Sequence, residues 1–115
     1  SAPEAVTAAL EAGRIPVVAP LARAAADPSV SLNVNADEAA AALAVGLGAD
    51  RIAFLSDVPG VLLDDAVVAT LAADEADRML GAGRFEGGIV PKLVAAVRAA
   101  RGGVPAQIGS TKVVA

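Results

Sequence analysis

Apolar residues along this chain form short continuous runs and longer helix-spaced stretches, with glycine or proline separating one from the next. A continuous apolar run bounded in this way is typical of a buried strand. Four such runs predict strands, at residues 15–19, 51–56, 106–108 and 112–114. Two shorter runs on either side of Asp64-Asp65-Ala66, at residues 61–63 and 67–69, predict a hairpin. Residues 21–34 follow no regular pattern and are expected to be irregular.

Helical spacing of apolar residues predicts four helices, over residues 3–12, 36–47, 74–80 and 91–101. Asn35 is expected to cap the second helix, because Glu38 follows it at the spacing of a capping box. Asp74 is expected to cap the third helix. Pro91 suits the first position of the fourth helix, where its missing N–H group is not needed. The glycines between residues 81 and 88 predict a loop before that helix.

The order of these elements indicates the class of fold. Strands that alternate with helices favour an α/β fold with a mainly parallel sheet. The predicted strands are apolar throughout rather than alternating, which indicates that helices cover both faces of the sheet. The expected architecture is therefore a three-layer α/β/α sandwich. A length of 115 residues leaves room for one domain, placed over residues 1–115.

Composition excludes several classes of protein. Hydrophobic residues make up 56% of the chain and the net charge is −4, so a disordered chain is excluded. Aromatic residues amount to 2% and acids outnumber bases by 13 to 9, so no nucleic-acid partner is expected. The sequence has no run of about 18 uncharged apolar residues, so no membrane span is expected.

The reactive side chains narrow the chemistry further. The chain has no cysteine and no histidine, which rules out disulfides, thiol nucleophiles and a Ser-His-Asp triad. An acid or base catalyst would have to be a carboxylate or one of the two lysines, Lys92 and Lys112. The chain start, Ser1 to Glu4, has neither a basic region nor a hydrophobic run. No signal peptide is therefore expected, and the cytoplasm is the expected location.

Three loop segments carry the polar residues that could form a site: Asn33–Asp37, Ser56–Gly60 and Gly87–Lys92. In open parallel sheets, ligands bind beyond the carboxyl ends of the strands, where these segments are expected. The first segment opens a helix, whose free N–H groups favour an anion. In the third, glycines allow a ligand close to the backbone and Lys92 offers a cation. Together the segments suit phosphoryl transfer, which depends mainly on positioning and charge stabilisation.

Each segment also has a purely structural interpretation, and the sequence leaves it open. Asn35 could serve only as a cap, and Asp37 only to offset the helix macrodipole. Val58-Pro59-Gly60 is ordinary turn chemistry, with no need of a ligand. Lys92 could be an exposed lysine in a first helical turn.

The three segments, in this order and spacing, resemble the carboxyl-terminal half of the acetylglutamate kinases, which belong to the amino acid kinase family. The resemblance covers nearly the whole chain. It implies ATP-dependent phosphorylation of the side-chain carboxylate of N-acetyl-L-glutamate, in arginine biosynthesis, with Mg²⁺ held through the nucleotide phosphates. The matching residues are Asn33-Val-Asn-Ala-Asp37, Leu55-Ser-Asp-Val-Pro-Gly-Val61 and Gly87-Gly-Ile-Val-Pro-Lys92, with further similarity in Gly13–Pro20 and Thr111–Val114.

The resemblance also implies roles for individual residues. Lys92 would stabilise the transferring phosphoryl group, Asp37 would orient the catalytic lysines, and Asn33 would contact the acetylglutamate. No residue of this chain is expected to bind a metal ion directly. Contacts with ATP would come from Asp57, Val58, Pro59, Gly60, Val61, Leu62, Arg84, Phe85 and Glu86.

The chain also departs from the family pattern. The family's amino-terminal half, with a lysine-glycine-glycine strand end, a second glycine-rich loop and a substrate-binding arginine, has no counterpart in these 115 residues. The segment between Ser110 and Thr111 is shorter than in the family. The chain is therefore expected to be inactive alone, and to form a homo-oligomer or to pair with the missing half. The alternatives are a non-catalytic nucleotide-binding module, a self-associating α/β scaffold, and a kinase of carrier-bound aminoadipate or glutamate.

Overall fold

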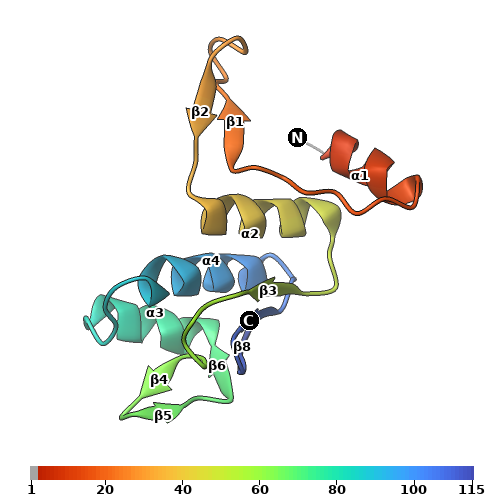
Figure 1. Ribbon diagram of the computed structural model, residues 1–115. Helices are drawn as coiled ribbons and strands as arrows, with labels where there is room; N and C mark the ends of the chain where they lie inside the picture. Colours follow the sequence, from red (N-terminus) through yellow and green to blue (C-terminus); the bar gives the residue numbers. More distant parts are fainter. Residues whose placement is uncertain (1–2) are drawn as a thin grey trace.

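A computed structural model describes residues 3–115, so Ser1 and Ala2, which belong to the chain start considered above, lie outside the described residues. The described residues contain the helices α1 (Glu4–Glu11), α2 (Ala36–Leu47), α3 (Ala73–Gly81) and α4 (Ile89–Arg101). The strands are β1 (Leu21–Arg23), β2 (Ser31–Asn33), β3 (Ile52–Phe54), β4 (Leu62–Leu63), β5 (Ala66–Val67), β6 (Thr70–Ala72), β7 (Ala106–Ile108) and β8 (Thr111–Val114). Figure 1 shows α1 and the β1–β2 hairpin standing apart from the other elements.

The central sheet has four strands in the order β3-β7-β8-β6. β3 runs parallel to β7 and β6 runs parallel to β8, whereas β7 and β8 form an antiparallel hairpin. Because two of these three pairings are parallel, the prediction of a mainly parallel α/β sheet is confirmed. The predicted hairpin after residue 60 is also present, as the antiparallel pair β4–β5.

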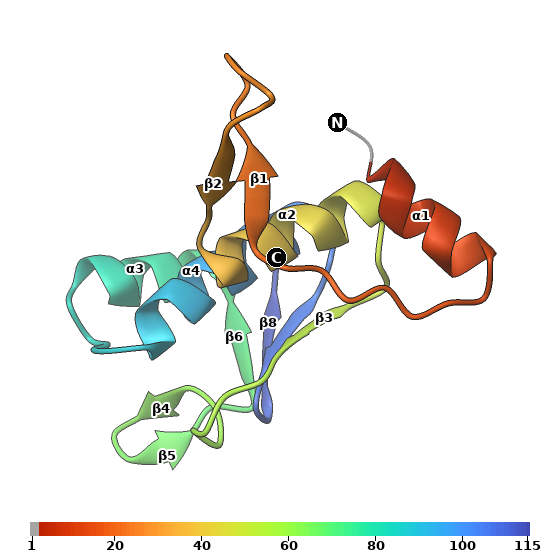
Figure 2. The same ribbon diagram turned by 45° about the horizontal axis from the view of Figure 1, so that its top comes forward.

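Three helices form a layer on one face of this sheet (Figure 2). α4 packs against β3, β7 and β8, with α2 beside it next to β3 and α3 beside it next to β6. Leu71, Leu93 and Ile108 are fully buried between the helices and the sheet, and small alanine side chains fill much of the remaining core. The α/β sandwich is thus confirmed, with α4 as its central helix.

The other face of the sheet is exposed in the part of the chain that the structure describes. On β7, Ala106 and Ile108 are buried while Gln107 is exposed, and on β8 Val113 is buried while Lys112 is exposed. This alternation follows from the strand geometry, in which successive side chains point to opposite faces. The expectation that helices of this chain cover both faces is therefore not met by residues 3–115, because strands of three or four residues are too short for sequence to distinguish the two burial patterns.

The first part of the chain, residues 3–35, forms an arm with little burial. The strand predicted at residues 15–19 is wrong: this segment is irregular, and Ile15 and Val17 are 92% and 96% exposed. An apolar run becomes a strand only where another strand pairs with it, and within the described residues this run has none. The segment 21–34, expected to be irregular, instead contains the antiparallel pair β1–β2, in which Leu21 faces Asn33.

The helix ends test the predicted caps. The Asn35 side chain accepts a hydrogen bond from the Glu38 N–H group at 3.0 Å, so the predicted cap of α2 is confirmed. The predicted cap of α3 is wrong, because α3 begins one residue before Asp74 and makes no side-chain cap bond. The Asp74 carboxylate accepts a hydrogen bond from Arg101 at 2.7 Å instead, which joins α3 to the end of α4. Asp74 is the second residue of α3, so Ala72 rather than Asp74 occupies the cap position.

α4 begins at Ile89, two residues earlier than predicted, so Pro91 is its third residue rather than its first. Proline is tolerated there because the first N–H groups of a helix have no partner within it. α4 is 13 residues long, and none of the helices within residues 3–115 is long and apolar enough to cross a membrane.

Candidate functional site

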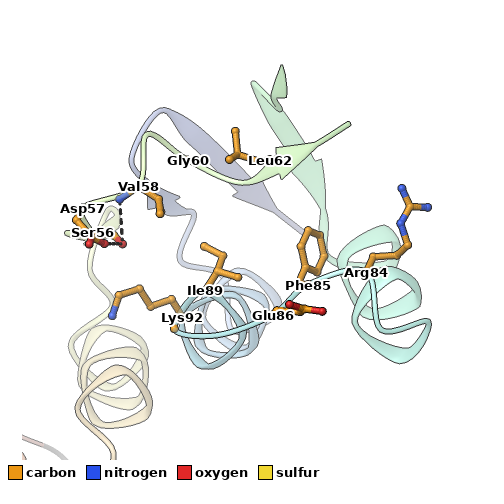
Figure 3. A pocket seen from close by; sticks show the side chains of 11 residues that line it. Ser56, Asp57, Val58, Gly60, Leu62, Arg84, Phe85, Glu86, Ile89 and Lys92 are labelled. Atoms are coloured by element: carbon orange, nitrogen blue, oxygen red, sulfur yellow. Dashed lines mark hydrogen bonds between the residues drawn. The ribbon is translucent and has the colours of Figure 1, made fainter. Parts of the chain in front are cut away.

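A pocket of about 410 Å³ lies beyond the carboxyl end of β3, between the segment 56–62 and the segment that leads into α4 (Figure 3). This is the place at which open α/β sheets bind their ligands. In the view of Figure 3, Lys92 and Ser56 lie towards one end, Arg84 lies at the other, and Ile89 and Phe85 lie between them. The lining residues are Ser56, Asp57, Val58, Gly60, Leu62, Arg84, Phe85, Glu86, Gly88, Ile89 and Lys92.

The upper wall is the turn that follows β3. The Ser56 hydroxyl accepts a hydrogen bond from the Val58 N–H group at 3.5 Å and lies 3.4 Å from Asp57 Oδ1. These local bonds hold the turn where the strand stops. Of the six residues predicted here, Pro59 and Val61 do not line the pocket, and Val61 is fully buried.

The lower wall is the segment before α4 and the first turn of that helix. Arg84, Phe85 and Glu86, all predicted from the resemblance, line the pocket. Gly87 has φ +70°, a conformation that favours glycine over residues with a side chain. A Cβ atom built on either Gly87 or Gly88 would meet no atom within 4 Å, so space is open above the backbone there.

Asp37 and Lys92 form an ion pair at the edge of the pocket, although they are far apart in the sequence. Lys92 Nζ donates to Asp37 Oδ1 at 3.1 Å and to Oδ2 at 3.3 Å. The side chain of Lys92 is 25% exposed and that of Asp37 is 19% exposed. Each residue lies in the first turn of its helix, so the carboxylate offsets the unfavourable effect of a cation near the N-terminus of α4. The packing of α2 against α4 brings them together.

Asn33 is not among the lining residues of this pocket. It is the last residue of β2, it is exposed, and it pairs with Leu21 across the hairpin. Two residues separate it from the start of α2. The structure therefore brings two of the three predicted catalytic and substrate-binding residues into contact, Asp37 and Lys92, and leaves the third on the arm.

Three lining residues were absent from the predicted site residues: Ser56, Gly88 and Ile89. Ser56 and Gly88 belong to segments that the sequence singled out, so their position was a usable signal. Ile89 belongs to the segment Gly87–Lys92 as well, but its apolar side chain has the pattern of an ordinary core residue, so only its position in that segment pointed to the site.

The pocket combines features that suit a nucleotide. Phe85, Ile89 and Leu62 provide apolar surface for a flat ring, and Lys92 offers a cation to an anionic group. Asp57 and Glu86 are the carboxylates of the lining. Within residues 3–115, no group of three or more carboxylates is placed to hold a metal ion.

Two pKa shifts lie outside the pocket. Hydrogen bonds to Asp74 and Asp77 raise the pKa of Arg101, at the end of α4. Hydrogen bonds from the side chain and the backbone N–H of Ser29 lower the pKa of Asp27, in the turn between β1 and β2. These groups stabilise local structure rather than the candidate site.

Known proteins similar to this chain agree with the fold and with the motifs. A sequence model described as the amino acid kinase family matches residues 1–110. Acetylglutamate kinase of Rubrobacter xylanophilus is 53% identical over 96 residues, which are 84% of this chain and 37% of that enzyme. Acetylglutamate kinase of Beutenbergia cavernae is 48% identical over 107 residues, which are 90% of this chain and 34% of that enzyme.

A solved structure, smu.665 from Streptococcus mutans, superposes with a TM-score of 0.88 at 28% identity, over 96% of this chain and 47% of that one. The chain spans 37% and 34% of the length of the two acetylglutamate kinases, which is about a third of each. Since the family model matches nearly all of the sequence, and the motifs and the α/β sandwich agree with it, the chain belongs to the amino acid kinase family.

Proposed function

We propose that this chain supplies the nucleotide-binding half of an acetylglutamate kinase, which transfers a phosphoryl group from ATP to the side-chain carboxylate of N-acetyl-L-glutamate. The observation that carries the proposal is the Asp37–Lys92 ion pair at the edge of a pocket with two glycine-bearing walls. The acetylglutamate kinase relatives support this choice of substrate over carrier-bound aminoadipate or glutamate.

Lys92 is the residue that stabilises the transferring phosphoryl group in this proposal. Phosphoryl transfer spreads negative charge over the oxygens of that group, so a fixed cation stabilises the transition state more than the ground state. Asp37 accepts two hydrogen bonds from Lys92 Nζ and thereby fixes the direction of the ammonium group. Asp37 is thus a positioning residue, and it does not act as a base.

The pocket lining would bind ATP or ADP. The apolar side chains of Phe85, Ile89 and Leu62 suit the base, and the end occupied by Lys92 suits the phosphates. The open space above Gly87 and Gly88 lets a ligand approach the backbone. Mg²⁺ would arrive with the nucleotide and be held through its phosphates, where it neutralises charge during transfer.

The acetylglutamate site would be completed from outside this chain. Asn33 is the one predicted substrate contact, and it lies exposed at the base of the hairpin, next to the start of α2. We therefore expect phosphoryl transfer only when the chain is joined to the amino-terminal half of a relative, and nucleotide binding without it.

Calorimetry with MgADP tests the nucleotide site directly. The 115-residue chain should release or absorb heat on titration, and the Lys112→Ala variant should behave in the same way, because Lys112 lies on the exposed face of the sheet away from the pocket. A folded chain with no heat and no thermal shift at millimolar MgADP would contradict the proposal. Phosphoryl transfer after the missing half is added would separate a kinase from a non-catalytic nucleotide-binding module.

Self-association is a second candidate property, which the open sheet favours. β3 and β6 are edge strands in the described residues, and an unpaired edge is a template for another strand. Leu55, which follows β3, is 90% exposed. Sedimentation should therefore show a dimer or a larger species, and a monomer at all concentrations would rule out a self-associating scaffold.

A further inference from the structure

Thr111 is a buried polar residue in a core that is otherwise apolar within residues 3–115. It is the first residue of β8 and its exposed fraction is 0%. A buried hydroxyl is costly unless it forms hydrogen bonds, so its partners indicate why it is there. Its side chain does not line the pocket.

The partners of the hydroxyl lie in the segments that begin and end the β4–β5 hairpin. Thr111 Oγ1 accepts a hydrogen bond from the Val61 N–H group at 2.9 Å. The same hydroxyl donates to the Val68 carbonyl at 2.6 Å. Val61 and Val68 are themselves joined, because the Val68 N–H group donates to the Val61 carbonyl at 2.9 Å. One hydroxyl thus ties the central sheet to the stretch of chain that carries Gly60 and Leu62 into the pocket.

The turn between β7 and β8 holds the preceding residues of the same stretch. The Pro59 carbonyl accepts hydrogen bonds from the Ser110 N–H group at 2.8 Å and from the Ser110 hydroxyl at 3.0 Å. A Cβ atom at Gly109 would collide with the Pro59 carbonyl. The two segments are therefore in close contact, with room for glycine alone at position 109.

Gly60 lies between Pro59 and Val61, the two residues that these hydrogen bonds hold, and its backbone has little room to move. A Cβ atom there would lie 2.6 Å from Thr111 Oγ1 and 2.9 Å from a methyl group of Val67. Both distances are shorter than real contacts of a Cβ atom. The backbone at Gly60 thus rests against the threonine hydroxyl on its core side, while the same residue lines the pocket on its other side.

We propose that Thr111 is a positioning residue for the nucleotide site. Through the Val61 N–H group it fixes the position of the turn 57–62 relative to the central sheet, and thereby the position of this wall of the pocket against a bound nucleotide. This inference rests on the proposed function, since it assigns the nucleotide to this pocket. Thr111 would not touch the ligand itself, because the contacts with the ligand would be made by Gly60 and Leu62. Pro59 and Val61, which do not line the pocket, would be the residues through which the turn is held.

The test compares two substitutions of Thr111 in the 115-residue chain, with MgADP as the probe. Thr111→Val keeps the shape and removes the hydroxyl, so the Val61 N–H and the Val68 carbonyl lose their partner. We expect about tenfold weaker MgADP binding, the order of effect of one lost buried hydrogen bond, and faster amide exchange at Val61. Thr111→Ser keeps the hydroxyl and should bind within about twofold of the unaltered chain.

Lys112→Ala is the matched control, since Lys112 is the next residue of β8 and faces away from the core. If Thr111→Val does not fold, Ser110→Ala tests the hold on the same turn with a smaller change. It removes the hydroxyl bond to Pro59 and keeps the bond from the backbone N–H group. We expect about threefold weaker MgADP binding for Ser110→Ala. Unchanged binding in Ser110→Ala, in that case, would overturn the inference.

The outcomes separate the inference from the proposed function. No binding of MgADP by the unaltered, folded chain would overturn the proposed function, and the nucleotide role of Thr111 with it. Binding by the unaltered chain that is equally tight in Thr111→Val would overturn the inference alone. Equal loss of binding in Thr111→Ser and Thr111→Val would also overturn it, because the serine retains the hydroxyl.

Discussion

The arm, residues 3–35, and the body, residues 36–115, use apolar side chains in opposite ways. In the body, Leu93 and Ile108 are completely buried between helices and sheet. In the arm, Ile15 and Val17 are almost completely exposed, and no residue of α1 is buried within its described span, Glu4–Glu11. The two regions have similar local patterns, so the difference arises from what lies beside them.

The elements of the arm form with little burial. α1 and the β1–β2 hairpin pair their backbone groups locally, and none of their residues is buried. In the body, by contrast, β6 and β3 pair with strands that come much later in the chain. A segment of this chain can therefore form a helix or a hairpin without becoming part of the core. Because the core lies in the body, we expect most of the stability of the chain to come from the body.

The largest expected effect is on the stability of the body. Leu93→Ala removes a fully buried side chain from α4 and leaves a cavity among the neighbouring helices and strands. We expect a loss of about 2–5 kcal/mol in the free energy of unfolding, measured by urea denaturation. Val17→Ala, at an exposed position of the arm, should change it by less than about 0.5 kcal/mol. Similar losses in both variants would show that the arm also packs in solution.

The next effect concerns catalysis at the edge of the body. In a chain joined to the amino-terminal half of a relative, Lys92→Ala should lower turnover by about 100-fold or more, because the proposed role of this charge is to stabilise the transition state. The affinity for ADP, which lacks the transferring group, should change far less. Lys92→Arg should restore activity only in part, because a planar guanidinium does not replace a compact ammonium group.

Lys112→Ala is the control for this experiment, since it removes the same charge from the exposed face of the sheet. Its turnover should remain close to that of the unaltered protein. Near-normal turnover in Lys92→Ala, or loss of activity through unfolding, would show that Lys92 has another role.

The sequence predicted the body better than the arm. α2, α4, β3, β7 and β8 all lie where apolar patterns and glycines indicated. Each of them has partners within the chain, so the local signal and the tertiary environment agree. The run at residues 15–19 carried the same signal, but no strand of the described residues pairs with it, and the prediction failed there.

The candidate site was predictable where its residues lie in loops next to strand and helix ends. Asp57, Glu86 and Lys92, which the resemblance singled out, line the pocket. The contact between Lys92 and Asp37 depends on how α2 packs against α4, which no local pattern specifies. Thr111 was missed as a positioning residue for the same reason, because its partners Val61 and Val68 lie more than forty residues earlier.

A smaller effect is expected where the arm joins the body. Asn35→Ala removes the side chain that caps α2, leaving the Glu38 N–H group without this partner. We expect a loss of about 1 kcal/mol in the free energy of unfolding, measured by urea denaturation. Asn33→Ala is the matched control, because it alters the same residue type two positions earlier, on an exposed strand. Equal losses in the two variants would mean that the cap contributes nothing of its own.

The smallest effect should stay inside the arm. Hydrogen bonds from Ser29 to Asp27 lower the pKa of the Asp27 carboxyl group, so these bonds favour its ionised form. Because the pKa is lower in the folded turn than in an unfolded chain, the bonds stabilise the turn above the ordinary aspartate pKa of about 3.9. This contribution disappears as the pH falls through the lowered pKa.

An NMR titration of the Ser29 amide proton measures this change. Its shift should follow a midpoint below the ordinary aspartate value in the unaltered chain, and it should show no such transition in Asp27→Ala. The midpoint of thermal unfolding at neutral pH should be the same in both, because the turn lies in the arm and contributes little to the core. A Ser29 midpoint at or above the ordinary aspartate pKa would contradict the turn geometry. A lower unfolding temperature in Asp27→Ala would instead show that the arm and the body are coupled.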